Sequence, residues 1–251
     1  MSLDVTKPFY HFSVDDVFDV LIEVTDRKLE LFTHPFFRFL KEMHDEFGMQ
    51  TSLYLFFQKE IDGSVRTLRE VTDVHRTALQ ASQWLRFGPH TLDYAHSPYA
   101  QMPTEQVKIF DTIYKEINRF AGSDVRARWV RLHYFSESYE LADYFHKKGV
   151  EALFTTDKDA ISYRIPDEEI KSDLARRGYV DYRGMTIIRS HGRIENLESN
   201  ETSEARFSQL LSSPGFCIFF THEVDCASLQ IQNHIRHMAR FFRQKGIPSF
   251  S

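Results

Sequence analysis

The sequence predicts an α/β fold built on a parallel β-sheet, and three observations lead to this class. Apolar runs of strand length alternate with stretches of helical periodicity, the order that parallel sheets produce. Several runs are apolar on both faces, as in strands that helices cover on either side. No internal repeat, low-complexity tract or clear linker interrupts residues 1–251, so we expect one domain. An open doubly wound sheet and a closed barrel both fit this pattern.

Seven segments are predicted strands because each is a short run dominated by aromatic and aliphatic residues. In chain order they are 9–14, 51–57, 84–88, 128–135, 151–156, 185–190 and 216–222.

Helical periodicity predicts five helices between and after these strands. They span 34–48, 103–122, 136–149, 166–178 and 228–246. Gly48 is placed to end the first helix as a C-cap. Residues 166–178 begin with acidic and end with basic side chains, which suits the helix dipole. The polar stretch 191–204 is predicted to be a surface loop or a short helix.

Composition excludes several classes of protein. The net charge is -5, and no Lys/Arg block indicates nucleic acid or a membrane surface as a partner. No apolar run approaches the roughly 20 residues that span a bilayer. The N-terminus lacks the features of a signal peptide, so we expect a cytoplasmic protein. Cys217 and Cys226 are expected to be buried, reduced thiols.

Chemically reactive side chains gather where the predicted strands end. In parallel α/β folds these positions converge on one face of the sheet. In chain order they are Asp15, Asp16, His90, Asp93, His96, Arg131, His133, Asp157, His222 and Glu223.

One carboxylate and two histidines around an open coordination position form a recurrent hydrolytic metal site. The adjacent Asp15 and Asp16 suit such a site, since one can ligate the cation while the other takes a proton. The cation would offset the repulsion between the two carboxylates.

Three segments resemble the motifs of the polysaccharide deacetylase family, the NodB-homology carbohydrate esterases. "HFSVDD" resembles the first motif, usually T-F-D-D, and "GPHTLDYAHSP" resembles the second, in which His-Thr precedes another histidine. "CIFFTHE" is similar to the last motif, an apolar strand that ends in histidine. Arg131 and the segment "KKGVEALFTTDKD" lie between the second and last motifs, in the same order as the corresponding parts of the family's sequences. The ordered set spans residues 11–223.

The resemblance implies a distorted (β/α)7 barrel and a metal-dependent hydrolase that removes an N- or O-acetyl group from a carbohydrate or another acylated small molecule. It implies Asp15 as the catalytic base, oriented by Arg131, and His222 as the general acid. It implies zinc, with cobalt or nickel as alternatives, as the divalent metal, and the ligands Asp16, His90 and His96. Residues expected near the substrate are Trp84, Tyr94, Tyr99, His133 and Asp157.

The second motif departs from the family pattern. Its histidines are normally four residues apart, whereas His90 and His96 are separated by six. Three interpretations stay open: a loop restores their convergence, His133 replaces one ligand, or the metal site is lost. The proline expected after Arg131 is also absent.

Two other functions compete with this hypothesis. The chain could be a non-catalytic descendant that binds a glycan or a partner. It could also be a glycoside hydrolase in which Asp15 works with a second carboxylate, such as Asp157 or Glu223.

Overall fold

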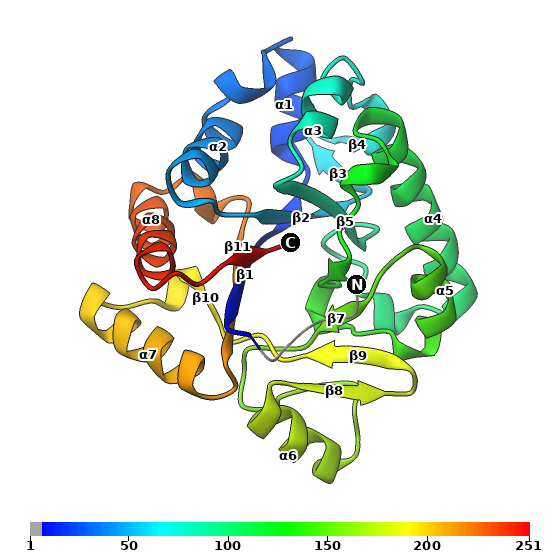
Figure 1. The fold of residues 1–251 in the computed structure, drawn as a ribbon. Helices are drawn as coiled ribbons and strands as arrows, with labels where there is room; N and C mark the ends of the chain where they lie inside the picture. Colours follow the sequence, from blue (N-terminus) through cyan, green and yellow to red (C-terminus); the bar gives the residue numbers. More distant parts are fainter. Residues whose placement is uncertain (1–6) are drawn as a thin grey trace.

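The structure of the protein is a computed structural model that describes residues 7–251. Residues 1–6, which belong to the segment used above to predict the absence of a signal peptide, lie outside the described residues. The predicted α/β class with a parallel sheet is confirmed. Figure 1 shows strands at the centre of the molecule and helices around them.

The larger sheet has the strand order β10-β11-β1-β2-β5, and all of these neighbours are parallel. The strand β1 lies at its middle and also pairs, near its start, with the C-terminal β12. Its members are β1 (Phe9–Val17), β2 (Thr51–Phe56), β5 (Leu85–Thr91), β10 (Gly192–Arg193), β11 (Phe216–His222) and β12 (Ser249–Phe250).

A smaller sheet has the order β6-β7-β9-β8, in which only β8 is antiparallel to its neighbour. It consists of β6 (Trp129–Val130), β7 (Ala152–Phe154), β8 (Tyr179–Tyr182) and β9 (Met185–Ile188). An isolated parallel bridge connects Phe87 of β5 to Arg126, three residues before β6. Each of the seven segments predicted to be strands therefore overlaps a strand of the structure. Closure of the sheets into a barrel stays a prediction.

Helices pack around the sheets. They are α1 (Asp19–Asp26), α2 (Pro35–Phe47), α3 (Arg76–Ala81), α4 (Pro103–Phe120), α5 (Ala142–Lys147), α6 (Glu168–Arg177), α7 (Asn200–Ser212) and α8 (Leu229–Gln244). None of the helices within residues 7–251 is both long and apolar enough to cross a membrane.

The local signals at helix ends have the expected effect. Gly48 adopts φ 72° after α2, so it is the predicted C-cap. The side chain of Asp167 accepts hydrogen bonds from the backbone N–H groups of Glu169 and Ile170 and caps α6. Two predictions were inexact: only the second half of 136–149 is α-helical, and the polar stretch 191–204 leads into the longer helix α7.

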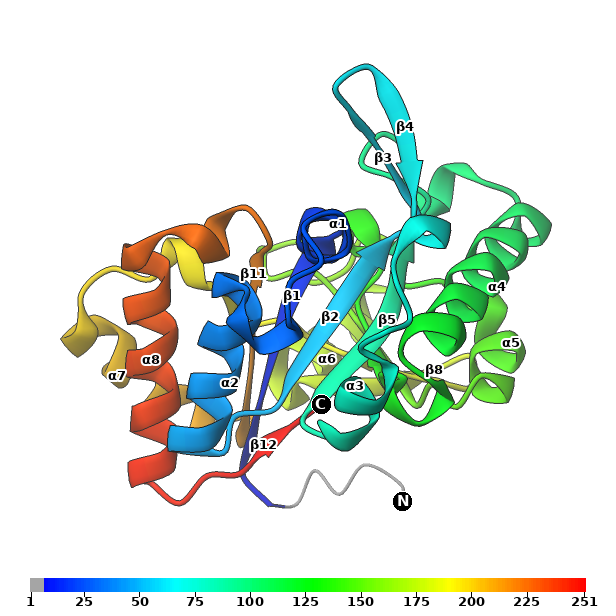
Figure 2. The ribbon, with the colours of Figure 1, turned by 90° about the horizontal axis from the view of Figure 1, so that it is seen from above.

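An antiparallel hairpin of β3 (Gln58–Ile61) and β4 (Ser64–Thr67) was missed by the sequence analysis. Figure 2 shows it projecting beyond the ends of the central strands. Its two-residue turn, Asp62-Gly63, has positive φ at both positions (51° and 75°), the backbone of a type I′ hairpin. The Asp-Gly pair was therefore an available signal for this element.

The predicted strand 128–135 is the one that differs most from expectation. Hydrogen bonding as a strand is limited to β6, and residues 133–135 form a 3-10 turn. Tyr134 and Phe135 both have positive φ, 54° and 53°. This turn brings the end of the segment into a pocket instead of continuing the sheet.

Aromatic and aliphatic side chains from strands and helices fill the interior, including most of the 23 phenylalanines. Both cysteines are free and buried, as predicted. Cys217 lies in β11 and Cys226 in the turn that follows it.

Candidate active site

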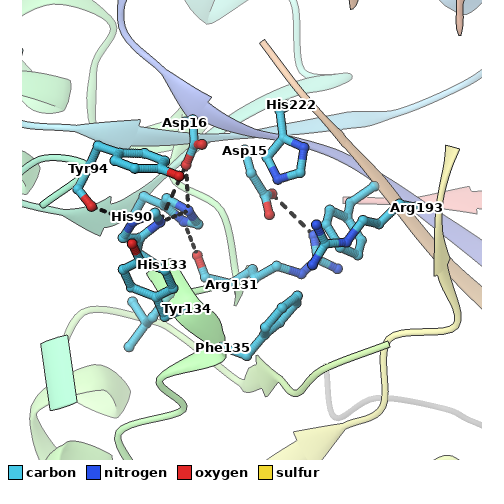
Figure 3. Close-up of a pocket in the computed structure, with 12 residues that line it drawn as sticks. Asp15, Asp16, His90, Tyr94, Arg131, His133, Tyr134, Phe135, Arg193 and His222 are labelled. Carbon is cyan, nitrogen blue, oxygen red and sulfur yellow. Dashed lines mark hydrogen bonds and ion pairs between the residues drawn. The ribbon is translucent and has the colours of Figure 1, made fainter. Parts of the chain in front are cut away.

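A pocket of about 140 Å³ lies at the carboxyl ends of β1, β5, β6 and β11. Figure 3 shows the side chains that surround it. Its lining consists of Asp15, Asp16, His90, Tyr94, Arg131, Leu132, His133, Tyr134, Phe135, Arg193, Phe220 and His222. Most of the residues predicted to carry chemistry are therefore gathered in one place.

The two adjacent aspartates reach the same pocket because β1 is irregular there. Successive side chains of a regular strand point to opposite faces. The register between β1 and β2 shifts between Val14 and Val17, and Asp16 has φ 60°. Such a bulge redirects a side chain, and aspartate tolerates this left-handed backbone better than most residues. Asp15 and Asp16 thus both line the cavity.

Asp15 is buried and paired with an arginine. Nη1 of Arg131 donates to Oδ1 of Asp15 over 3.2 Å and to the hydroxyl of Ser13 over 2.5 Å. The guanidinium lies over the rings of Phe220 and Phe154, 4.1 and 4.9 Å from their centroids. Arg131 is 1% exposed, so these contacts hold it in one position and keep its charge beside Asp15.

The second carboxylate, Asp16, faces two histidines. Its Oδ1 lies 3.1 Å from Nε2 of His90 and 3.5 Å from Nδ1 of His133. The two ring nitrogens are 3.3 Å apart. His90 is itself the extra residue at a register shift of β5 against β2, between Pro89 and Thr91. Bulges in two strands therefore help to build this cluster.

Backbone carbonyls determine which nitrogen of each ring carries the proton. Nδ1 of His90 lies 2.7 Å from the carbonyl oxygen of Arg131, and Nε2 of His133 lies 3.0 Å from that of Tyr94. A carbonyl only accepts, so these two nitrogens are the donors. In the neutral rings the remaining nitrogens carry lone pairs, and these are the ones that face Asp16.

The resulting cluster fits a divalent metal ion. Asp16 Oδ1 is buried, and with both rings neutral three electron-pair donors face one another, an arrangement that a cation among them would stabilise. Ligands of a tetrahedral zinc ion, each at about 2.0–2.1 Å, lie about 3.3 Å apart. The observed separations of 3.1, 3.3 and 3.5 Å match this value. Carbonyl acceptors behind both rings are also typical of metal-binding histidines.

The pKa of Asp16 indicates that its carboxyl group is negatively charged. Burial raises this pKa, but hydrogen bonds from His133 and His90, which require a second proton on the ring, lower it well below its ordinary value. A cation held by the same three groups would act in the same direction. The carboxyl group is therefore ionised at any pH at which the protein is expected to work.

His96, the second histidine of the predicted ligand set, is outside this cluster. Its Nδ1 lies 2.6 Å from Oδ1 of Asp93, and its side chain is 54% exposed. The same oxygen accepts the backbone N–H groups of Ala95 and His96, which bends the loop and turns the ring away. The structure brings His133 to Asp16 and His90 instead, which corresponds to one of the interpretations left open by the sequence.

His222 approaches the pocket from β11, where it is the register partner of Asp15. Its Nδ1 lies 3.1 Å from Oε1 of Glu195 and 3.5 Å from Oδ2 of Asp225. Burial lowers its pKa, but Glu195 and the two pocket aspartates outweigh burial and raise the pKa to about 9. The ring is therefore protonated at neutral pH and can donate a proton.

Only some of the residues predicted to contact substrate line the pocket. Tyr94 and His133 line the pocket, whereas Asp157 lies behind it, 3.4 Å from Nε of Arg193. Tyr99 is exposed and is not among the lining residues. Trp84 precedes the amino end of β5 and stacks on His44 at 4.9 Å, so it belongs to the core far along the strand from His90.

Sequence reasoning missed four residues around the pocket: Arg193, Glu195, Tyr134 and Phe135. The first two fall in the polar stretch that was predicted to be a surface loop or a short helix. A signal did exist for them, because this stretch directly follows the sixth predicted strand and so lies at a strand end. No sequence pattern indicates the left-handed backbone of Tyr134 and Phe135.

Comparisons with known proteins find similarity in structure only. No family model matches the sequence. No curated protein matches it either.

Several solved structures share the fold. The 4-alpha-glucanotransferase from Thermococcus litoralis has a TM-score of 0.59 at 12% identity. This comparison covers 98% of the present chain, which spans 40% of the length of that enzyme. The Xyl-CE4 domain of a multidomain xylanase from the hindgut metagenome of Trinervitermes trinervoides has a TM-score of 0.51 at 8% identity, covering 98% of this chain and 87% of that one. A family 4 carbohydrate esterase from Streptomyces lividans (TM-score 0.49) and peptidoglycan deacetylases (TM-scores 0.49 and 0.48) are also among the matching structures.

At these identities the comparisons establish the fold. They confirm the predicted resemblance to polysaccharide deacetylases at that level, since a family 4 carbohydrate esterase domain matches nearly the whole chain. What the pocket does must be argued from its own residues.

Proposed function

We propose that the protein is a metal-dependent hydrolase that removes an N- or O-acetyl group from a carbohydrate. The observation that carries this proposal is the convergence of Asp16, His90 and His133, whose electron-pair donors have the spacing of a tetrahedral metal site. The fold shared with a family 4 carbohydrate esterase domain supports the same conclusion.

We assign the metal ligands to Asp16, His90 and His133. Two imidazoles and one carboxylate suit zinc, with cobalt or nickel as alternatives. When bound, the cation would polarise the acyl carbonyl and lower the pKa of a water molecule in the pocket.

Asp15 is the proposed general base. It is next to the ligand Asp16 but is held by Arg131 and not by the histidines. The guanidinium aligns the carboxylate, and the ring of Phe220 restricts the guanidinium in turn. A water molecule that attacks the acyl carbon would pass its proton to Asp15.

His222 is the proposed general acid. Its pKa of about 9 keeps the ring protonated at neutral pH, and it lies beside Asp15 on the neighbouring strand. As the acyl carbon–nitrogen or carbon–oxygen bond breaks, the ring would donate its proton to the leaving sugar amine or alkoxide. Glu195 orients the ring and stabilises its charge.

The competing glycosidase hypothesis needs a second free carboxylate beside Asp15. Both carboxylates considered for this role, Glu223 and Asp157, are engaged by other groups. The carboxylate of Glu223 accepts three backbone N–H groups at the start of α1, from Phe18, Asp19 and Val20. Asp157 is engaged by Arg193. Neither group is placed to act together with Asp15 on a glycosidic bond.

The test is acetate release from N-acetylated and O-acetylated sugars, after chelation and after addition of zinc, cobalt or nickel. We expect release that depends on the metal and falls at least 100-fold in Asp15→Asn, the size typical for loss of a general base. Glu198→Asn, an exposed substitution on the loop after Glu195, is the matched control and should keep full activity.

A non-catalytic glycan-binding protein would behave differently. It would release no acetate with any metal, and Asp15→Asn would leave glycan binding unchanged. Cleaved glycosidic bonds without acetate would instead support the glycosidase hypothesis.

A further inference from the structure

One charged side chain in the pocket has no function in the chemistry proposed above. The other charged or titratable side chains of the pocket already contact one another or neighbouring groups of the protein; these are Asp15, Asp16, Arg131, His133 and His222. Arg193 also lines the cavity. Its closest ion-pair contact is between Nε and Oδ2 of Asp157, at 3.4 Å. Within residues 7–251, no hydrogen bond engages its terminal nitrogens, Nη1 and Nη2, and its ion pair with Asp157 is closest at Nε.

The position of Arg193 is nevertheless well determined. Its guanidinium lies over the rings of Phe220 and Phe135, 5.4 and 5.6 Å from their centroids. Asp157, whose side chain is only 7% exposed, holds the Nε side. Phe135 adopts φ 53°, a left-handed backbone that is costly for a bulky residue. These contacts keep the guanidinium in place while leaving its two terminal nitrogens available, an arrangement that suits bidentate binding of an anion.

The guanidinium of Arg193 lies near the proposed catalytic residues. Phe220 lies under both Arg193 and Arg131, and Arg131 holds the proposed base Asp15. Figure 3 shows Arg193 entering from β10, between His222 and Phe135. Because the shared cavity is small, about 140 Å³, a group bound by Arg193 belongs to the same sugar unit that carries the acyl group.

We propose that Arg193 binds an anionic oxygen group of the substrate, so that the substrate is an acylated sugar bearing a carboxylate or a phosphate. This inference rests on the proposed deacetylase function and deepens it by naming the substrate class. A carboxylate and a phosphate present the same paired oxygens to a guanidinium, and the experiment below separates the two.

The first experiment measures binding alone. Titration calorimetry would compare glucuronate, glucose 6-phosphate and glucose as probes for the wild-type protein, for Arg193→Gln and for Arg176→Gln. Arg176 lies on α6 with an exposed side chain, so its substitution removes the same charge away from the pocket. We expect the wild type and Arg176→Gln to bind one anionic probe more tightly than glucose. Arg193→Gln should lose this difference, a drop of roughly ten- to a hundredfold for a charge-assisted hydrogen bond.

The second experiment measures acetate release from N-acetylglucosamine, its 6-phosphate and N-acetylglucosaminuronic acid. Arg193→Gln should raise KM for the preferred anionic substrate by the same factor and leave kcat and the neutral substrate nearly unchanged. An equal loss on neutral and anionic substrates would overturn the proposal, because Arg193 would then act on the reaction itself.

The two experiments separate the proposal from the proposed function. If no substrate releases acetate, the function fails, while a binding preference that depends on Arg193 still supports an anion site. If acetate is released but the wild type shows no preference for either anionic group, the anion site is wrong and the deacetylase proposal stands.

Discussion

His133 illustrates how the hydrogen bond of a single side chain directs a ring nitrogen toward the other proposed metal ligands. It lies in a turn after β6, and its Nε2–H donates to the carbonyl of Tyr94, which directs Nδ1 toward Asp16. His96 is closer to His90 in the sequence but is held by Asp93. The partner of each ring, and not its separation along the chain, determines which nitrogen is available for a metal.

We therefore predict that His133→Ala weakens zinc binding by more than tenfold, because losing a ligand costs at least as much as losing a hydrogen bond behind one. His96→Ala is the matched control, and its zinc affinity should stay within about twofold of wild type, since surface substitutions have small effects. Competition with a chromophoric chelator measures both affinities. The opposite ranking would restore His96 as the ligand.

The pKa of His222 leads to a second prediction. Its value of about 9 exceeds the ordinary 6.5 mainly because of Glu195, Asp15 and Asp16, which together outweigh burial. Activity should fall as the pH rises through about 9, where the ring loses its proton. Glu195→Gln should move this alkaline limb at least about one pH unit lower, since each unit corresponds to about 1.4 kcal/mol of interaction. A pH profile of kcat/KM measures the shift.

The same shift affects stability, with a definite sign. A histidine whose pKa is raised on folding stabilises the native state fully below pH 6.5, and this contribution is lost as the pH rises through about 9. Denaturant unfolding between pH 6.5 and 9 should therefore show a steeper loss for the wild type than for Glu195→Gln. If the activity of Glu195→Gln falls at the same alkaline pH as that of the wild type, Glu195 does not maintain the charge on His222.

Among the elements, helix α1 depends on a residue that is distant in sequence. The carboxylate of Glu223 accepts the N–H groups of Phe18 and Val20 over 2.5 and 2.7 Å, and that of Asp19 over 3.1 Å. The N-cap residue of this helix, Phe18, has no side chain that can cap it. Burial raises the pKa of Glu223 to about 7. The residue beside the proposed general acid is thus structural, and it joins the ends of β1 and β11.

Glu223→Gln should lower the free energy of unfolding by about 1–3 kcal/mol, since one acceptor oxygen becomes an amide group facing buried donors. Glu198→Gln, an exposed substitution of the same type, should change it by less than about 0.5 kcal/mol. Urea denaturation measures both values. Equal stability of the two variants would show that water replaces the cap without cost.

At the scale of the whole molecule, the first and last strands of the described residues meet in the central sheet. β12 pairs with the start of β1, and Nδ1 of His11 donates to the carbonyl of Phe250 over 2.9 Å. Burial is the main reason that the pKa of His11 falls to about 3, so the ring is neutral and needs this acceptor. The first strand is complete only when the last residues are in place.

Deleting residues 249–251 should therefore destabilise the protein by at least about 1–3 kcal/mol, the cost of leaving a buried donor without an acceptor. It would also remove the pairing of β12 with β1. Deleting only Ser251 should cost much less, since it keeps the bond to His11. Thermal unfolding of both truncated proteins measures the difference, and equal melting temperatures would contradict this function of β12.

By itself, the sequence determined the α/β class, the position of seven strands and most of the helices, because hydrophobic periodicity and helix caps are local properties. It also placed Asp15, Asp16, His90, Arg131 and His222 at strand ends, where parallel strands gather their reactive groups. Elements with weaker local signals were missed, such as β8, or predicted inexactly, such as α7.

Only the tertiary structure decided which of these side chains meet. The bulges at Asp16 and His90 arise where β1 and β5 pair with β2, and the left-handed turn at Tyr134 brings His133 to Asp16 and His90. The contact of Asp93 with His96 is local, but no periodic pattern in the sequence indicates it. Arg193 likewise reaches the pocket, and Glu195 reaches His222, because β10 pairs with β11. Periodicity in one segment carries no information about the orientation of a side chain relative to another, and it is that orientation that assembles a site.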